Sequence, residues 1–190
     1  MKNAEEPRKV HEESPVDLRR DEELMDLSRA GSRDAFGALV RRHQQPLLNF
    51  FLRLGADIHG AEDCAQESLL RLYRYRDRYT PSSPFPAFLY TLARHAWIDC
   101  SRRRARRAAV PLERAAAMGS ERAPDDRLDL RAALATLPQK LRMVLVLSVD
   151  QGLNLAEIAA VLGIPTGTVK SRMFHAVRRL REVLHAQPRT

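Results

Sequence analysis

The segment 154–180 reads NLAEIAAVLGIPTGTVKSRMFHAVRRL, and it constrains the fold of this chain more than any other stretch. Asn154 can cap a helix, and Glu157, three residues later, can accept a hydrogen bond from the Asn154 backbone and close a capping box. The apolar residues that follow repeat at the spacing of one helical face: Leu155, Ile158, Ala159 and Leu162. The segment therefore predicts a short amphipathic helix that starts at Asn154.

A tight turn and a second helix are predicted next. Gly163 can adopt the left-handed conformation that ends a helix, and Pro165 prevents the first helix from continuing. A helix that begins near Thr166 would bury Val169, Met173, Val177 and Leu180. The residues that would then face outward are Lys170, Ser171, Phe174, His175 and Arg178. Short polar, basic and apolar side chains near the start of a second helix suit the DNA major groove, where bases expose donors, acceptors and the thymine methyl.

The basic character of the chain agrees with this reading. Of 190 residues, 32 are Lys or Arg and 24 are Asp or Glu, for a net charge of +8, which suits one or two small domains that meet a polyanion. The alternative is a helical hairpin whose basic face is merely solvated, and such helices are common. The coincidence of cap, tight turn and polar N-terminal face favours a DNA-reading helix-turn-helix.

Composition disfavours several other classes of protein. Cys64 and Cys100 have no CxxC partner and no nearby histidine pair, so we expect reduced, buried thiols, no metal site and no cofactor. The N-terminal region lacks the apolar core of a secretory signal, and the longest apolar run, 143–147, is too short to span a bilayer. We therefore expect a cytoplasmic protein without membrane insertion.

Helical periodicity recurs along the chain without any alternating strand pattern, so we predict an all-α fold of two small helical domains. Residues 1–20 are charged and aperiodic and predict a disordered tail. Residues 21–107 predict the first domain, in which Pro46 indicates a kink or a helix restart. Residues 108–124 lose periodicity and predict a flexible linker, and residues 125–186 predict the second domain, which ends in the helix-turn-helix.

Three segments resemble the signature motifs of one protein family. They are DCAQESLLRLYR from Asp63, FPAFLYTLARHAWIDCSRRR from Phe85 and LNLAEIAAVLGIPTGTVKSR from Leu153. In order and spacing they resemble bacterial sigma factors, specifically the extracytoplasmic function (ECF) group of the sigma-70 family. The resemblance covers about residues 21–184. It implies a sigma2-like bundle that melts the minus-ten promoter element and a sigma4-like domain that reads the minus-thirty-five element, both docked on core RNA polymerase.

The resemblance assigns a polymerase contact to the helix around Asp63. One face of this helix is rich in acids and amides, which is unusual in a basic chain. Spacing alone leaves an ordinary solvated face equally acceptable, and the resemblance decides between the two. The residues expected to contact the clamp of the polymerase are Asp63, Gln66, Glu67 and Arg71.

Aromatic and basic residues between positions 74 and 107 suit strand separation, because exposed bases stack on aromatic rings at about 1–3 kcal/mol per base. By resemblance, the segment 77–85 should hold a flipped base, and His95, where ECF members usually carry Asn, should face the upstream edge of the element. Trp97 is expected in the core. For Phe88, a position in the core is the alternative to base stacking. The residues expected at the minus-ten element are Tyr75, Tyr79, Ser82, Ser83, Phe85, Phe88, Arg94, His95, Arg102 and Arg103.

In the reading helix, the resemblance directs Lys170, Ser171, Phe174 and His175 toward base edges and Thr168, Arg172 and Arg178 toward phosphates. Many relatives carry Arg at position 175. Histidine is mostly neutral at physiological pH, so it would add less electrostatic affinity than Arg.

The leading hypothesis is a promoter-specificity factor without chemistry of its own, with core RNA polymerase and promoter DNA as partners. Its resemblance also implies an anti-sigma factor. A free-standing helix-turn-helix regulator is the first alternative, and the acidic face near Asp63 argues against it. A hydrolase is the second, but Asp125, Asp126 and Asp129 adjoin the linker without a neighbouring histidine, so we expect no enzymatic activity.

Overall fold

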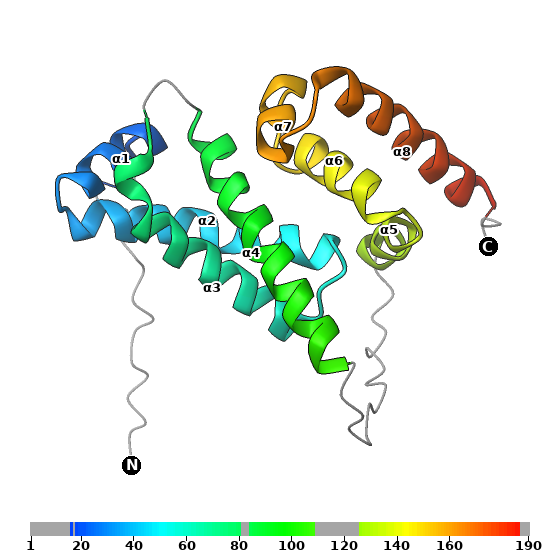
Figure 1. Cartoon of the computed structure of the whole chain (residues 1–190), viewed down its shortest axis with the longest axis horizontal. Coiled ribbons are helices and arrows are strands. Elements are labelled where there is room, and N and C mark those ends of the chain that lie inside the picture. Colours follow the sequence, from blue (N-terminus) through cyan, green and yellow to red (C-terminus); the bar gives the residue numbers. More distant parts are fainter. Residues whose placement is uncertain (1–15, 17, 81–83, 109–125, 187–190) are drawn as a thin grey trace, which may run out of the picture.

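The structure is a computed structural model that describes residues 16, 18–80, 84–108 and 126–186. Within these residues every regular element is helical, which confirms the all-α prediction (Figure 1). The elements are α1 (Asp21–Arg29), α2 (Arg33–Arg53), α3 (Ile58–Arg74), the 3-10 turn η1 (Arg76–Arg78), α4 (Phe85–Ala108), α5 (Asp126–Ala135), α6 (Gln139–Val149), α7 (Leu155–Leu162) and α8 (Thr166–Ala186). The predicted tail and linker lie almost wholly outside the described residues.

Helix α2 starts where local signals place it and continues past its proline. The Ser32 hydroxyl accepts a hydrogen bond of 3.2 Å from the Ala35 N–H and caps the helix. Pro46 lies inside α2, and the predicted alternative of a helix restart was wrong. An interior proline costs a helix about 3 kcal/mol. The burial of Leu47, Phe50 and Phe51 just after it offsets that cost, at roughly 1.5–3 kcal/mol for each side chain.

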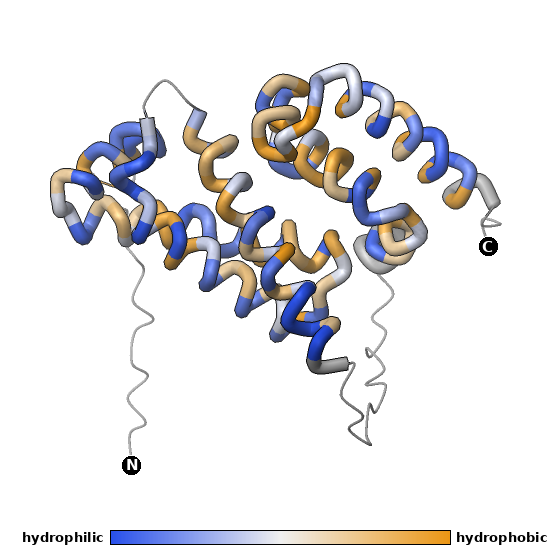
Figure 2. The backbone as a smooth tube through the Cα atoms, in the orientation of Figure 1, coloured by the Kyte–Doolittle hydropathy of each residue, from blue (hydrophilic) through white to orange (hydrophobic). Residues whose placement is uncertain are grey.

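The N-terminal unit, α1–α4, is built on a core of aromatic and aliphatic side chains. Helix α2 packs on α1 and α3, and α3 packs on α4. Trp97 of α4 is 5% exposed and its ring stacks on Phe51 of α2 with centroids 6.1 Å apart, so its predicted place in the core is confirmed. Figure 2 shows that hydrophobic residues recur along α2 and α4.

The C-terminal unit, α5–α8, forms around the long helix α8, which packs against α5, α6 and α7 (Figure 1). Part of its core is made by Leu134, Leu137, Leu145 and Ala176. None of the helices that the structure describes is long and apolar enough to cross a membrane.

The two units also pack on each other, a contact that the sequence did not predict. Helix α4 lies against α7, and the apolar core runs from one unit into the other. Arg142 and Arg131 of the C-terminal unit donate hydrogen bonds of 2.9 Å to the carbonyls of Leu54 and Ala56. Further polar contacts between the units join Arg53 to Asp150 and the Tyr90 hydroxyl to the Gln151 amide oxygen.

Candidate nucleic-acid interface

The turn between α7 and α8 is built by the signals that predicted it. The Asn154 Oδ1 accepts hydrogen bonds from the backbone N–H groups of Ala156 and Glu157 at 2.9 and 3.0 Å. Glu157 Oε2 accepts one from the Asn154 N–H at 2.8 Å, so the capping box is confirmed. Gly163 has a φ of 63° and ends α7, and Pro165 precedes α8. These contacts set the angle at which α8 leaves the turn.

The buried face of α7 differs from the predicted apolar stripe, since it includes Val161, lacks Leu155 and leaves Ala159 half-buried. Ile158, Val161 and Leu162 are buried, whereas Leu155 is 38% exposed. Leu155 therefore belongs to the predicted apolar stripe but not to the buried face. The buried face is centred on the last two turns, and Leu155, as the first residue of α7, lies at its open end.

Helix α8 turns a polar and basic face outward. Val169 and Ala176 are buried beneath it, and Met173, Val177 and Leu180 are half-buried. The five side chains predicted to face outward are all exposed: Lys170, Ser171, Phe174, His175 and Arg178. Phe174 is 63% exposed, which is unusual for a large apolar side chain. Its ring is arranged edge to face with the His175 ring, with centroids 5.7 Å apart. Thr168 and Arg172 are half-buried at the margin of this face.

A groove of about 360 Å³ brings together three of the residues predicted at the minus-ten element. Tyr75 from the end of α3 and His95 and Arg102 from α4 line it, together with Arg71 and Asp99. Burial, and then the neighbouring Arg94, lower the pKa of His95, so this imidazole is neutral at physiological pH. The Tyr75 ring, the neutral His95 imidazole and the Arg102 guanidinium are thus gathered around one groove.

Other residues of the minus-ten set lie elsewhere. Tyr79 and Phe85 are 1% and 0% exposed, and their rings are arranged edge to face with centroids 6.2 Å apart. Phe88 is half-buried against Tyr79, Arg94 is half-buried, and Arg103 is exposed. Ser82 and Ser83 lie outside the described residues. The stacking of bases on Tyr79 and Phe85 stays a prediction, and in this structure both rings support the start of α4.

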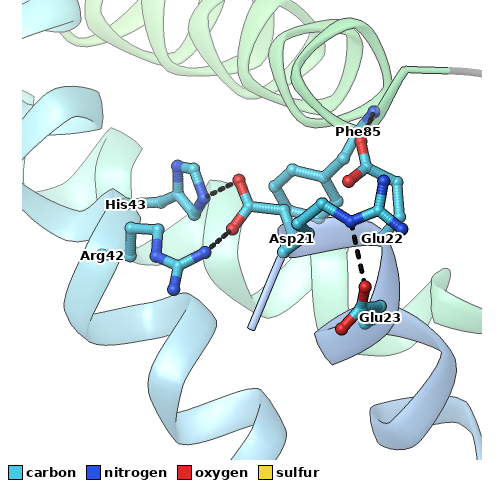
Figure 3. Close-up of polar contacts among 7 residues, drawn as sticks. Asp21, Glu22, Glu23, Arg42, His43 and Phe85 are labelled. Carbon is cyan, nitrogen blue, oxygen red and sulfur yellow. Dashed lines mark hydrogen bonds and ion pairs between the residues drawn. The ribbon is translucent and has the colours of Figure 1, made fainter. Parts of the chain in front are cut away.

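Helix α1 anchors the start of α4, a role that the sequence did not indicate (Figure 3). Asp21 accepts hydrogen bonds from two residues of α2: one from Arg42, and one of 2.9 Å from His43 Nε2. The centroid of the His43 ring lies 5.1 Å from the centroid of the Phe85 ring. Glu22 Oε1 accepts a long hydrogen bond of 3.5 Å from the Phe85 N–H. Burial opposes the ionisation of Asp21, but the bonds to His43 and Arg42 outweigh it and lower its pKa.

The residues predicted to contact polymerase cluster on α3. We call Asp63, Gln66 and Glu67 the acidic patch; the first two are exposed and the third is half-buried. They line an open cavity of about 470 Å³ with Leu70, Cys100, Arg103 and Arg104. Arg71 does not join them in this cavity, because its guanidinium bonds to Glu67 and Asp99.

Comparison with known proteins gives concordant matches over both units. The family described as "Sigma-70 region 2" matches residues 39–107, and "Sigma-70, region 4" matches residues 133–182.

The chain is also similar to curated proteins. It is 39% identical over 155 residues to the ECF RNA polymerase sigma factor SigL of Mycobacterium tuberculosis, a match that spans 77% of this chain and 87% of SigL. It is 35% identical over 155 residues to SigE of Mycolicibacterium smegmatis, spanning 77% of this chain but only 60% of that relative. Identity to SigW of Bacillus subtilis is 30% over 170 residues, or 81% of this chain and 91% of SigW.

Two solved structures share the arrangement of the helices. CnrH in complex with the cytosolic domain of CnrY matches with a TM-score of 0.69 and 26% identity, covering 88% of this chain and 98% of CnrH. RpoE of Bartonella quintana, solved with the anti-sigma factor NepR, matches with a TM-score of 0.67 and 27% identity, covering 80% of this chain and 98% of that one.

Proposed function

The chain belongs to the ECF group of the sigma-70 family, and we propose that it directs RNA polymerase to promoters by reading a minus-thirty-five element and by melting and capturing a minus-ten element. Sigma factors are DNA-binding initiation factors and not enzymes, so phosphodiester synthesis falls to the core polymerase. We assign core binding and minus-ten recognition to residues 21–107, a linking role to residues 108–124, and minus-thirty-five recognition to residues 125–186.

The observation that carries this proposal is the exposed face of α8. Lys170, Ser171, Phe174 and His175 offer a cation, a hydroxyl, an apolar ring and an imidazole to base edges. These groups match the donors, acceptors and thymine methyl of the major groove. Thr168, Arg172 and Arg178 flank them and suit contacts to the phosphates on either side.

The groove at Tyr75, His95 and Arg102 supports the minus-ten assignment. A displaced base needs a ring on which to stack and a cation for its phosphate, and Tyr75 and Arg102 supply both. His95, being neutral, can accept as well as donate a hydrogen bond to a base edge. We propose that the other residues predicted at this element contribute further contacts: Tyr79, Ser82, Ser83, Phe85, Phe88, Arg94 and Arg103.

The acidic patch is the proposed contact with core polymerase. Its carboxylates and amide are exposed at Asp63 and Gln66 and half-buried at Glu67, and an acidic cluster in a chain of net charge +8 suits a basic partner surface and repels DNA. An anti-sigma factor is a further proposed partner, supported by the similar RpoE solved with NepR.

The test is initiation by the purified chain with core polymerase on a randomised promoter library. We expect sequence-specific initiation only with core, and weak binding by the free chain, because each DNA-reading unit is small. Tight, promoter-specific binding by the chain without core would overturn the proposal and favour a free-standing helix-turn-helix regulator.

A further inference from the structure

The two cysteines of the chain, at positions 64 and 100, lie side by side between α3 and α4. Cys64 is fully buried on α3 and Cys100 is half-buried on α4, and each lies about one helical turn from a position, Gly60 or Arg104, at which these two packed helices meet. The helices approach closely here, since a Cβ built on Gly60 of α3 would lie 2.3 Å from the Arg104 guanidinium of α4. Two thiols held together across a rigid helix pair form a site that neither sequence spacing nor the proposed function assigns.

Cys100 is the accessible member of the pair. Cys100 is one of the residues that line the open cavity of about 470 Å³, so a small solute can approach it from solvent. Arg103 Nη2 donates a hydrogen bond of 3.2 Å to Cys100 Sγ.

Cys64 has the opposite environment. Burial, and then the hydrogen bond with Cys100, raise the pKa of the Cys64 thiol, so it is protonated and shielded while the chain is folded. It cannot readily react first with a solute, but it is placed to react second with Cys100. Among the described residues, no group of three or more His, Cys, Asp or Glu could hold a metal ion, and this includes the surroundings of the two thiols.

We propose that Cys64 and Cys100 are a reversible redox pair, which a peroxide converts from two thiols into an intramolecular disulfide between α3 and α4. The Cys100 sulfur attacks a peroxide oxygen, the O–O bond breaks, and the departing hydroxide takes the proton that the Cys100 thiol gives up and leaves as water. The resulting sulfenic acid on Cys100 is attacked by the Cys64 sulfur, the S–S bond forms, and the S–O bond breaks. The hydroxyl leaves with the Cys64 proton as a second water. Two thiols are oxidised by two electrons, and one hydrogen peroxide is reduced to two waters.

The experiment treats the reduced full-length chain with increasing hydrogen peroxide, quenches it, unfolds it and alkylates the remaining thiols with a maleimide before intact-mass analysis. We expect both thiols to disappear together, with a mass lower by two hydrogens, a proteolytic fragment that joins Cys64 to Cys100, and full recovery with dithiothreitol. The cross-link should also raise the melting temperature by roughly 5 °C or more, because it restricts the unfolded chain.

Two variants separate the roles of the cysteines. In Cys64→Ala, peroxide should stop at a sulfenic acid on Cys100 that dimedone traps. In Cys100→Ala, Cys64 should keep its thiol at the peroxide dose that fully oxidises the wild type. Loss of the Cys64 thiol in Cys100→Ala at the wild-type rate would overturn the order of attack. A wild-type product in which Cys100 alone is oxidised, or in which two chains are joined, would overturn the pairing itself. None of these measurements contains polymerase or DNA, so they stand apart from the proposed function.

Discussion

Arg71 of α3 donates a hydrogen bond of 2.8 Å to Asp99 of α4 and so ties the two helices together. The same guanidinium bonds to Glu67 of the acidic patch at 2.7 Å. Burial opposes the charged form of Arg71, but the hydrogen bonds to Glu67 and Asp99 outweigh it and raise its pKa. A test of the polymerase contact must therefore separate lost surface charge from a loosened helix pair.

The first prediction makes that separation. Asp63→Ala combined with Glu67→Ala should weaken binding to core polymerase by about tenfold or more, because two carboxylates are lost from the proposed contact. Asp99→Ala is the matched control, since it removes a partner of Arg71 but leaves the acidic patch in place. It should lower stability by about 1 kcal/mol and leave core affinity unchanged. Affinity is measured by titration of labelled chain with core, and stability by urea unfolding. Equal losses of affinity in both variants would count against the contact.

The second prediction concerns the anchor between Asp21 and His43. The pKa of Asp21 is lowered in the folded chain, so its contribution to stability is present above its unfolded pKa and is lost as pH falls through the folded one. Asp21→Asn should therefore cost about 2 kcal/mol at pH 7 and progressively less below about pH 4. Urea unfolding of both proteins across this range gives the difference directly. A penalty that does not change with pH would show that the ionised carboxylate is not what stabilises the anchor.

The third prediction tests His95 at the minus-ten groove. Because the pKa of His95 is lowered, the imidazole is already neutral at pH 7, and base preference at the upstream edge should be unchanged between pH 7 and pH 8. His95→Asn keeps a neutral donor and acceptor but changes their geometry, and it should shift preference at one or two upstream bases by about 1 kcal/mol or more. Transcription from single-base promoter variants measures both effects. A preference that His95→Asn leaves intact would remove His95 from base recognition.

Sequence predicted the features of this fold that depend on local signals. The capping box at Asn154, the left-handed Gly163 and the outward face of α8 each depend on residues a few positions apart, so helical periodicity and capping rules are enough to locate them. Trp97 was also placed correctly, because its spacing continues the apolar stripe of α4.

The features that were missed depend on how distant helices are aligned. Cys64 meets Cys100, and Asp21 meets His43, only because of the register between packed helices, which periodicity within one helix does not determine. The contact between α4 and α7 was missed for the same reason. Pro46 shows a related limit, since burial in the tertiary core outweighs a local helix-breaking signal.

The last prediction separates base reading from phosphate anchoring on α8. A base-edge contact discriminates between sequences by about 1–3 kcal/mol, whereas a phosphate contact strengthens binding to all sequences alike and steepens its salt dependence. Lys170 and His175 are exposed on the outer face, and Arg172 is half-buried at its margin. Lys170→Ala and His175→Ala should therefore relax preference at individual minus-thirty-five bases, and Arg172→Ala should lower output on every promoter variant about equally.

The measurement for α8 is transcription with core polymerase on a library of single-base promoter changes at two salt concentrations. Arg172→Ala serves as the control for general loss of affinity, because its effect should shrink all outputs in parallel and flatten the salt dependence. If Lys170→Ala and His175→Ala lower transcription equally on all promoter variants and leave base preference intact, these side chains contact the DNA phosphates and not the base edges. The outer face of α8 would then be rotated away from the base edges, and recognition would have to come from another part of the helix.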